Sequence, residues 1–285
     1  MSATSATVVM DERKPTVEIK PRTGWFDFDF QGLWQYRELL YFLTWKDVII
    51  RYKQTVIGAA WAILQPLLTM VIFTMVFRKF AGVSSDGLPY PIFAFTALLP
   101  WQFFSQAVSR SSTSLVTNRE MISKVYFPRL IMPISSTLSP AIDFCIAFVI
   151  LIGMMAWYGL APTWGILALP IFLLLALQTA LAVCFFLSAL NVKYRDVGHT
   201  IPFLVQCWMY ASPVAYSVNL VPESWRFWYS LNPMVGVIEG FRWALLSKAS
   251  PDFGAMITSA VAVTVLFVTG LIFFRRMERT FADVI

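Results

Sequence analysis

Ionisable side chains, the groups that move protons or hold charged intermediates, are almost absent from the long apolar stretches of this sequence. Asp143 is the one clear case, while His199 and Asp196 stand at the edge of another stretch. A proton- or ion-coupled carrier needs several such groups at similar depth, and a membrane glycosyl- or acyltransferase needs carboxylates or histidine at a membrane face. The sequence therefore disfavours both classes. For Asp143, which follows Ser139-Pro140, two roles stay open: a structural bond to a freed backbone group and a direct part in transport.

Metal and nucleotide chemistry are not expected either. The three cysteines lack metal-ligand spacing, and a single histidine cannot build a histidine-based site, so no metal site is predicted. The one glycine pair with phosphate-loop spacing, Gly82 and Gly87, is followed by Leu88 where the motif needs Lys. We expect no cofactor in this chain, and if the function uses ATP and Mg²⁺, a separate ATPase must bind them.

Composition indicates the surroundings of these side chains. Hydrophobic residues make up 58% of the 285 and charged residues only 13%, against about 25% charged in a soluble domain. Crossing a bilayer core takes about 20 helical residues, and five stretches without any charged residue offer that length. We therefore expect an all-α integral membrane protein. Its six transmembrane helices are predicted at Ile57–Phe77, Pro89–Ser109, Leu130–Trp157, Trp164–Leu190, Ile201–Ala215 and Ala255–Phe274.

Basic residues are distributed unevenly between the two sides of these spans. The segments before the first span and after the second, fourth and sixth hold 17 of the 22 Lys and Arg residues. This positive-inside pattern predicts cytoplasmic N- and C-termini. It also explains the net charge of +6 through contact with acidic membrane lipids, so no nucleic-acid partner is expected. Residues 1–32 are predicted to be a cytoplasmic tail, because the first part lacks the apolar region of a signal peptide.

Residues 33–53 are predicted to form an amphipathic helix that lies in the membrane interface. An aromatic stripe with basic neighbours suits such a helix, although a helix buried against the spans is the alternative. Residues 54–285 then form the six-span domain. The stripe consists of Trp34, Tyr41, Trp45, Val48 and Tyr52.

A short cytoplasmic helix is predicted between spans two and three, at about 118–126. Thr117 and Glu120 match the capping box Ser/Thr-x-x-Glu, and Pro128 closes the segment. A rigid helix between two spans transmits force to both of them. The alternative is an ordinary loop.

The segment between spans five and six, about residues 217–250, is too apolar for a solvated loop. It is predicted to form two short re-entrant helices that break at Asn232-Pro233. Glu239 and Arg242 stand three residues apart and are expected to pair on the second helix. Aromatic residues near this outer mouth offer flat apolar faces to a sugar ring. The candidates for a channel or outer gate are Trp101, Phe104, Tyr210, Tyr216, Trp225 and Trp228.

Five motifs resemble, in matching order, those of the permease subunits of polysaccharide ABC exporters of the O-antigen, capsule and teichoic acid type. Together they are highly specific, and the resemblance covers about residues 33 to 279. The motifs are Arg51-Tyr-Lys-Gln-Thr-Val-Ile-Gly-Ala-Ala-Trp-Ala-Ile-Leu-Gln-Pro-Leu-Leu68, Asn118-Arg-Glu-Met-Ile-Ser-Lys-Val-Tyr-Phe-Pro-Arg129, Asn191-Val-Lys-Tyr-Arg-Asp-Val197, Ala211-Ser-Pro-Val214, and Asn232-Pro-Met234 with Glu239-Gly-Phe-Arg242.

The resemblance implies a bacterial inner-membrane exporter of two permease copies and two nucleotide-binding ATPase subunits, with a polyprenyl-pyrophosphate-linked glycan as substrate. It implies no catalysis in this chain. An exporter of another amphiphile is the main alternative. The ATPase-coupling residues implied are Asn118, Arg119, Glu120, Met121 and Lys124. The residues implied to meet the lipid pyrophosphate at the inner entrance are Arg51, Lys53, Arg119, Lys124 and Arg129.

Overall fold

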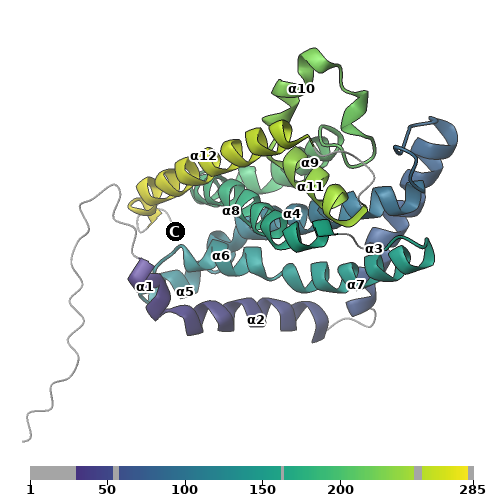
Figure 1. Cartoon of the computed structure of the whole chain (residues 1–285). Helices are drawn as coiled ribbons and strands as arrows, with labels where there is room; N and C mark the ends of the chain where they lie inside the picture. The colour runs from purple at the N-terminus through teal and green to yellow at the C-terminus, as the bar shows by residue number, and fades with distance from the viewer. Residues whose placement is uncertain (1–29, 54–57, 162–163, 247–251, 282–285) are drawn as a thin grey trace, which may run out of the picture.

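The computed structural model describes residues 30–53, 58–161, 164–246 and 252–281, and every regular element within these ranges is a helix (Figure 1). Most of the predicted cytoplasmic tail therefore lies outside the described residues. Four described segments are long and apolar enough to cross a membrane: Ala60–Phe80, Ile131–Trp157, Trp164–Lys193 and Phe253–Glu278. They correspond to the first, third, fourth and sixth predicted spans.

The second predicted span lies in α4 (Tyr90–Thr117), the central helix of the structure. It packs against α3 (Gly58–Phe73), α8 (Leu169–Lys193) and α11 (Pro233–Leu246), among others. Nearly every side chain in its first half is buried in protein. A helix enclosed by other helices needs no lipid-facing surface, so α4 tolerates glutamines and a run of serines. Because of this composition, α4 is not among the four segments that are apolar enough to cross a membrane.

The fifth predicted span, Ile201–Ala215, corresponds to α9 (Asp196–Tyr210). The helix begins earlier than expected, because Asn191 holds the bend that precedes it. The side-chain oxygen of Asn191 accepts the Gly198 N–H at 2.9 Å. At 15 residues, α9 is about 22 Å long, which is shorter than a bilayer core of about 30 Å.

The third predicted span bends, and the fourth packs along the sixth. α6 (Ile131–Leu138) and α7 (Ala141–Trp157) meet at Ser139-Pro140, as expected where proline removes a backbone hydrogen bond. α8, which follows a 3₁₀ turn at Trp164–Ala168, packs along α12 (Phe253–Glu278). The two helices approach closely at Gly270, where an added Cβ would lie 2.7 Å from the carbonyl oxygen of Ala182.

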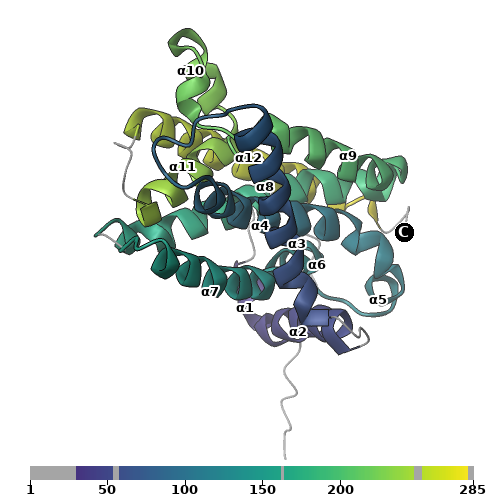
Figure 2. The same ribbon diagram turned by 90° about the vertical axis from the view of Figure 1, so that its right-hand side faces the viewer.

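Two further groups of helices lie on opposite sides of the body in both ribbon views (Figures 1 and 2). On the lower side are α1 (Phe30–Gln35), α2 (Arg37–Lys53) and α5 (Arg119–Lys124), with α2 running along α6. On the upper side, α10 (Glu223–Ser230) projects from the body, and α3 continues into a π-helix at Thr74–Phe80.

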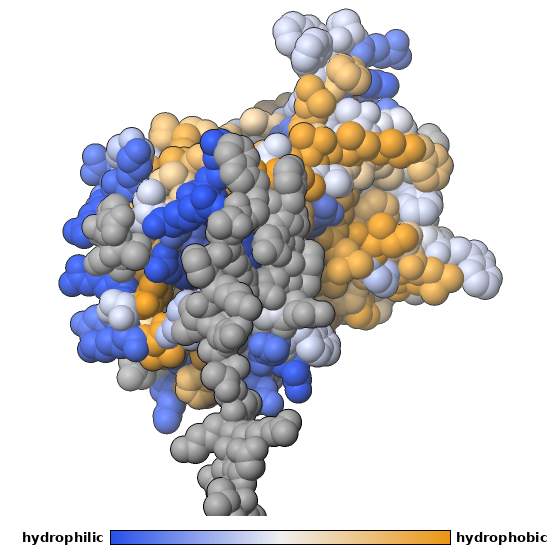
Figure 3. Space-filling view, turned by 90° about the vertical axis from the view of Figure 1, so that its left-hand side faces the viewer, coloured by the Kyte–Doolittle hydropathy of each residue, from blue (hydrophilic) through white to orange (hydrophobic). Residues whose placement is uncertain are grey.

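α2 packs against α6 and exposes most of its aromatic residues. Trp34, Tyr41 and Trp45 of the predicted stripe are exposed, whereas Val48 is buried. Figure 3 views the end of the body that carries α5 and the C-terminal end of α12. Hydrophilic side chains gather on one half of this face and hydrophobic side chains on the other.

Candidate functional site

The first candidate site, predicted to be cytoplasmic, is centred on α5, which follows α4 directly. Asn118 separates the two helices, and its side-chain N–H donates to the Ser114 carbonyl at 2.8 Å. Its side-chain oxygen accepts from Lys46 of α2 at 3.3 Å. The predicted coupling helix is therefore tied at its first residue to both α4 and α2.

The predicted capping box is wrong. Thr117 is the last residue of α4, and Asn118 takes the N-cap position of α5 without a side-chain capping bond. Tertiary contacts extend α4 this far, since Leu115 is buried and the Ser111 hydroxyl donates to the Pro133 carbonyl of α6 at 3.0 Å. The helix itself is shorter than predicted, ending at Lys124.

α5 has an inner and an outer face. Met121 and Ile122 pack against the hydrophobic cluster beneath them, so Met121 anchors the helix and is not part of its outer surface. Glu120 and Lys124 form an ion pair of 3.6 Å with both side chains more than 70% exposed. Arg119 is exposed as well, and this charged face is open to a partner.

A second cluster joins the end of α2 to α4 and α7. Arg51 forms an ion pair with Asp143, and the Tyr52 hydroxyl donates to the other oxygen of the same carboxylate. Arg51 also donates to the side-chain oxygen of Gln106 at 2.7 Å. Asp143 is thus bound by two side chains of α2, and the expected bond to a freed backbone group is not found among the described residues.

The five basic residues predicted at the inner entrance differ in their contacts. Arg51 is held by Asp143, and Arg129 donates to the Glu278 carbonyl of α12 at 2.6 Å while covering the Phe281 ring. Lys53, Arg119 and Lys124 are exposed. The structure therefore does not bring all five together into one basic surface.

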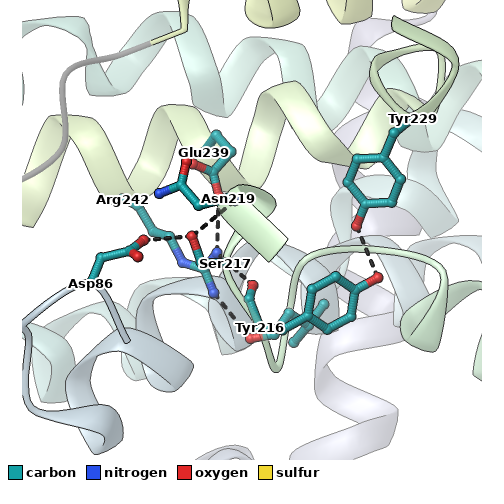
Figure 4. A network of polar contacts seen from close by, with 8 residues as sticks. Asp86, Tyr216, Ser217, Asn219, Tyr229, Glu239 and Arg242 are labelled. Carbon is teal, nitrogen blue, oxygen red and sulfur yellow. Dashed lines mark hydrogen bonds and ion pairs between the residues drawn. The ribbon is translucent and has the colours of Figure 1, made fainter. Parts of the chain in front are cut away.

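The outer candidate site is organised by Arg242 of α11 (Figure 4). Its guanidinium pairs with Glu239 at 2.9 Å, which confirms the predicted pair. It also donates to the carbonyls of Val214 and Tyr216, at 3.1 and 3.2 Å. Burial lowers the pKa of Arg242 and the charge of Glu239 opposes this shift. The arginine end of the pair is buried, whereas the Glu239 side chain is 27% exposed.

The loop before η3 (Val218–Leu220) joins this arrangement to the connection between α3 and α4. The Ser217 hydroxyl donates to Asp86 at 2.5 Å, and Asp86 adopts a positive φ of 52°. The Tyr229 hydroxyl of α10 donates to that of Tyr216 at 3.0 Å. Burial and this hydrogen bond raise the pKa of Tyr229 above its usual value, so its hydroxyl stays protonated.

The predicted break between the two outer helices at Asn232-Pro233 is confirmed. Asn232 binds the end of α9 through both the oxygen and the nitrogen of its side-chain amide. Its oxygen accepts the Trp208 indole N–H at 2.9 Å, and its nitrogen donates to the Ala211 carbonyl at 3.0 Å. Predicted residues 247–250 of this outer segment lie outside the described residues.

Among the six aromatic candidates, the structure separates two from the rest. Trp101 and Phe104 are buried inside the core, 3% and 0% exposed, so they do not line a channel in this conformation. Their rings pack against each other and, for Phe104, against Trp208. An open groove of about 520 Å³ lies at the outer end, within the size range of ligand sites, and its lining includes Tyr216, Trp225, Trp228 and Tyr229. Tyr210 is exposed near the end of α9.

Comparison with known proteins identifies the family. The sequence matches the profile of the ABC-2 type transporter family over residues 38–246, from α2 to the last residue of α11. The chain belongs to this family. Both candidate sites fall largely within the matched residues, and an ABC-2 transporter chain with several apolar helices of spanning length is a multi-pass membrane protein.

Three relatives are similar to this ABC-2 chain over most of its length. An O-antigen export system permease protein from Myxococcus xanthus is 31% identical over 250 residues, which cover 86% of this chain and 95% of the relative. A protein of the same name from Klebsiella pneumoniae is 27% identical, covering 87% and 95%. The polysialic acid transport protein KpsM from Escherichia coli is 21% identical, covering 82% and 91%.

Sequence reasoning missed three features of this ABC-2 transporter chain. The partner of Asp143 was one of them, since Arg51 stands 92 residues away. Gln65 of α3 and Gln206 of α9 are exposed amides on otherwise apolar helices, and a search for uncharged polar residues within the predicted spans would have found them. Val125 and Tyr126, directly after α5, are both exposed. Nothing in the sequence around them differs from an ordinary loop.

Proposed function

We propose that this chain is the permease subunit of an ATP-driven exporter that moves a lipid-linked polysaccharide, such as O-antigen, across the bacterial inner membrane. The observation that carries the proposal is the similarity, over most of both chains, to relatives named O-antigen export permeases. The substrate class is a polyprenyl-pyrophosphate-linked glycan, as the family resemblance implies. The chain conducts the cargo and does no chemistry on it.

The proposed topology has six spans, with α4 and α9 as the second and fifth. α4 is 28 residues long and enclosed by other helices, which supports a span that needs no apolar exterior. α1 and α2 then lie in the inner membrane interface, with Trp34 of α1 and Tyr41 and Trp45 of α2 toward the lipid. α10 and α11 form the outer re-entrant segment, and both termini are in the cytoplasm.

Two copies of the chain are proposed to enclose the path of the glycan. α3 and α9 bury few of their side chains within one subunit. An amide facing hydrocarbon without a hydrogen-bond partner costs several kcal/mol. The exposed Gln65 and Gln206 therefore support a second copy or the polar cargo, in place of lipid, beside these two helices.

Two ATPase subunits, which bind the ATP and Mg²⁺, are proposed to dock at α5. The exposed charges of Arg119, Glu120 and Lys124 support this surface, while Asn118 ties it to α4 and α2. Lys53, Arg119 and Lys124 remain candidates for contact with the lipid pyrophosphate. At the outer end, Tyr210, Tyr216, Trp225 and Trp228 are proposed to form the exit gate.

Deletion of the gene tests the function. Gel analysis of surface polysaccharide should show that the glycan is lost, while its lipid-linked precursor accumulates inside the cell. Complementation with the wild-type gene should restore the surface glycan. Unchanged surface glycan and unchanged precursor in the deletion strain would contradict the proposal.

A further inference from the structure

The outer groove of about 520 Å³ is lined by α10 and by the segment that precedes it. Trp225 and Trp228 of α10 are 65% and 63% exposed, so their flat rings are open to a ligand. None of the described residues that line the groove carries a charge. They are Tyr216, Leu220, Val221, Pro222, Trp225, Trp228 and Tyr229.

One wall of this groove is fixed by the rest of the protein. The backbone carbonyl of Tyr216 accepts from Arg242 at 3.2 Å, and the Tyr216 hydroxyl donates to the Tyr210 carbonyl at 3.0 Å. The Tyr216 side chain is therefore held at both of its ends. A site with an ordered wall loses less conformational entropy when a ligand binds.

The two phenol groups of the groove offer acceptors to a ligand. The Tyr229 hydroxyl donates its hydrogen to the Tyr216 oxygen (Figure 4), and the Tyr216 hydroxyl donates its own to Tyr210. A phenol has a single hydrogen to donate, so both donors are committed while oxygen lone pairs stay available. A ligand that matches these oxygens must bring O–H or N–H groups of its own.

These features together favour an uncharged sugar. A sugar ring places C–H groups on an aromatic face and hydroxyl donors at its edge, which matches the tryptophan rings and the phenol oxygens. A carboxylate or a phosphodiester has no hydrogen to donate, so its oxygens would face the phenol oxygens without a hydrogen bond. A hydrocarbon chain would cover the rings and leave the same oxygens without a donor.

The helices proposed to border the glycan path carry no charge either. α3 has no charged residue from Gly58 to Phe73, and α9 has none from Ile201 to Tyr210. An acidic glycan would bring a charge in every repeat unit to these helices, and an unpaired charge away from water is costly. A neutral glycan avoids this cost along its whole length.

We propose that the outer groove is a binding subsite for an uncharged glycan. Trp225 and Trp228 stack on its sugar rings, and the oxygens of Tyr216 and Tyr229 accept from its hydroxyls. The repeat unit then consists of neutral hexoses, deoxyhexoses or N-acetylhexosamines, without uronic acids, sialic acids or phosphate bridges. This inference rests on the proposed function, because it specifies which class of glycan the exporter carries.

Composition analysis of the surface glycan that is lost on deletion of the gene gives the first test. We expect a repeat unit without uronic acid, sialic acid or phosphate. An acidic unit in every repeat would overturn this inference and leave the proposed function intact. Unchanged surface glycan in the deletion strain would instead contradict the function itself.

Equilibrium binding tests the groove directly, with the full chain and any subunits that co-purify reconstituted in nanodiscs. Maltoside detergents are avoided because they carry a sugar. The probe is the glycan released from the wild-type surface by mild acid and labelled with a fluorophore. Trp225→Ala and Trp228→Ala should each weaken binding about fivefold or more. Unchanged binding by both variants would point to a hydrocarbon chain as the occupant and overturn the proposal.

Trp157→Ala and Trp164→Ala are the matched controls for these variants. Both side chains lie outside the groove and are 86% and 89% exposed, so the loss of either ring should leave the affinity for the glycan unchanged. Losses equal to those of Trp225→Ala and Trp228→Ala would overturn the assignment to the groove.

A charged form of the same glycan tests the selection against acidic sugars. Light carboxymethylation adds carboxylates, and carboxamidomethylation adds groups of the same size without charge. The carboxymethyl glycan should bind about fivefold more weakly than the carboxamidomethyl glycan, and equal affinities would overturn the proposal. Leu220→Lys places a cation in the groove and should restore binding of the carboxymethyl glycan. Leu167→Lys, at another exposed leucine outside the groove, should not, and restoration by both variants or by neither would contradict this site.

Discussion

The guanidinium carbon of Arg242 lies 3.6 Å from the centre of the Phe93 ring. Phe93 is a buried residue of α4, and Arg242 belongs to α11. A desolvated cation over an aromatic face stabilises by about 2 kcal/mol or more. This contact, together with the hydrogen bonds of Arg242 to the loop after α9, joins the central helix to the outer segment.

Arg242→Gln should destabilise the protein strongly. The substitution removes the ring contact and the hydrogen bonds of the buried guanidinium to two backbone carbonyls, which together cost about 2–3 kcal/mol. Thermal unfolding of the purified protein in detergent measures the effect. Arg226→Gln is the control, because Arg226 is only half-buried and makes one hydrogen bond of 3.3 Å to the Val221 carbonyl. Equal melting temperatures for the two variants would show that Arg242 does not hold the outer segment.

Gly240→Ala should destabilise the contact of α11 with α8. An added Cβ would lie 2.1 Å from a ring carbon of Phe172, and such overpacking costs about 1–3 kcal/mol. Gly153→Ala has no atom within 4 Å of the added Cβ and gains up to about 1 kcal/mol of helix propensity. The melting temperature should therefore fall for Gly240→Ala and rise for Gly153→Ala. A stabilised Gly240→Ala protein would contradict the close approach of these helices.

Charge reversal on α5, with Glu120→Lys and Lys124→Glu combined, should reduce glycan export while leaving membrane insertion intact. The reversed residues can still pair with each other, and an exposed pair contributes only about 0.3–0.5 kcal/mol. A loss of export then reports on docking of the ATPase. Surface glycan and the amount of co-purified ATPase are the two measurements. Normal export with the ATPase still bound would remove the coupling role of α5.

The same reversal at Arg275 and Glu278 provides its control. This pair stands three residues apart at the end of α12, at 3.1 Å, and lies outside the proposed docking surface. We expect export to continue. Equal losses of export from both reversals would show that the effect is a general disturbance of this end of the protein.

Helix positions were predictable from sequence where charge and proline mark them. The bend at Ser139-Pro140 and the break at Asn232-Pro233 follow from backbone chemistry, and Glu239 pairs with Arg242 because both lie on one helix. The burial of Trp101 was not predictable, because the first half of α4 is apolar on almost every side and carries no periodic signal for its facing.

Contacts between residues far apart in the sequence could not be predicted either. The Thr117 capping motif is a local pattern, and packing of α4 against α6 overrode it. Arg51 has the properties of an interfacial cation in the sequence, and only the folded chain brings it to Asp143. The sequence does not single out Gln65, because its side chain carries no charge. Only its exposure on the apolar helix α3 shows that a polar group faces outward there.

The central claim is that this chain provides a pathway and has no energy source of its own. ATP-dependent transport of a lipid-linked glycan into proteoliposomes tests it most directly, with the chain reconstituted alone and together with its ATPase. We predict no transport for the chain alone and ATP-dependent transport once the ATPase is present. Uphill transport by the chain alone would contradict the account.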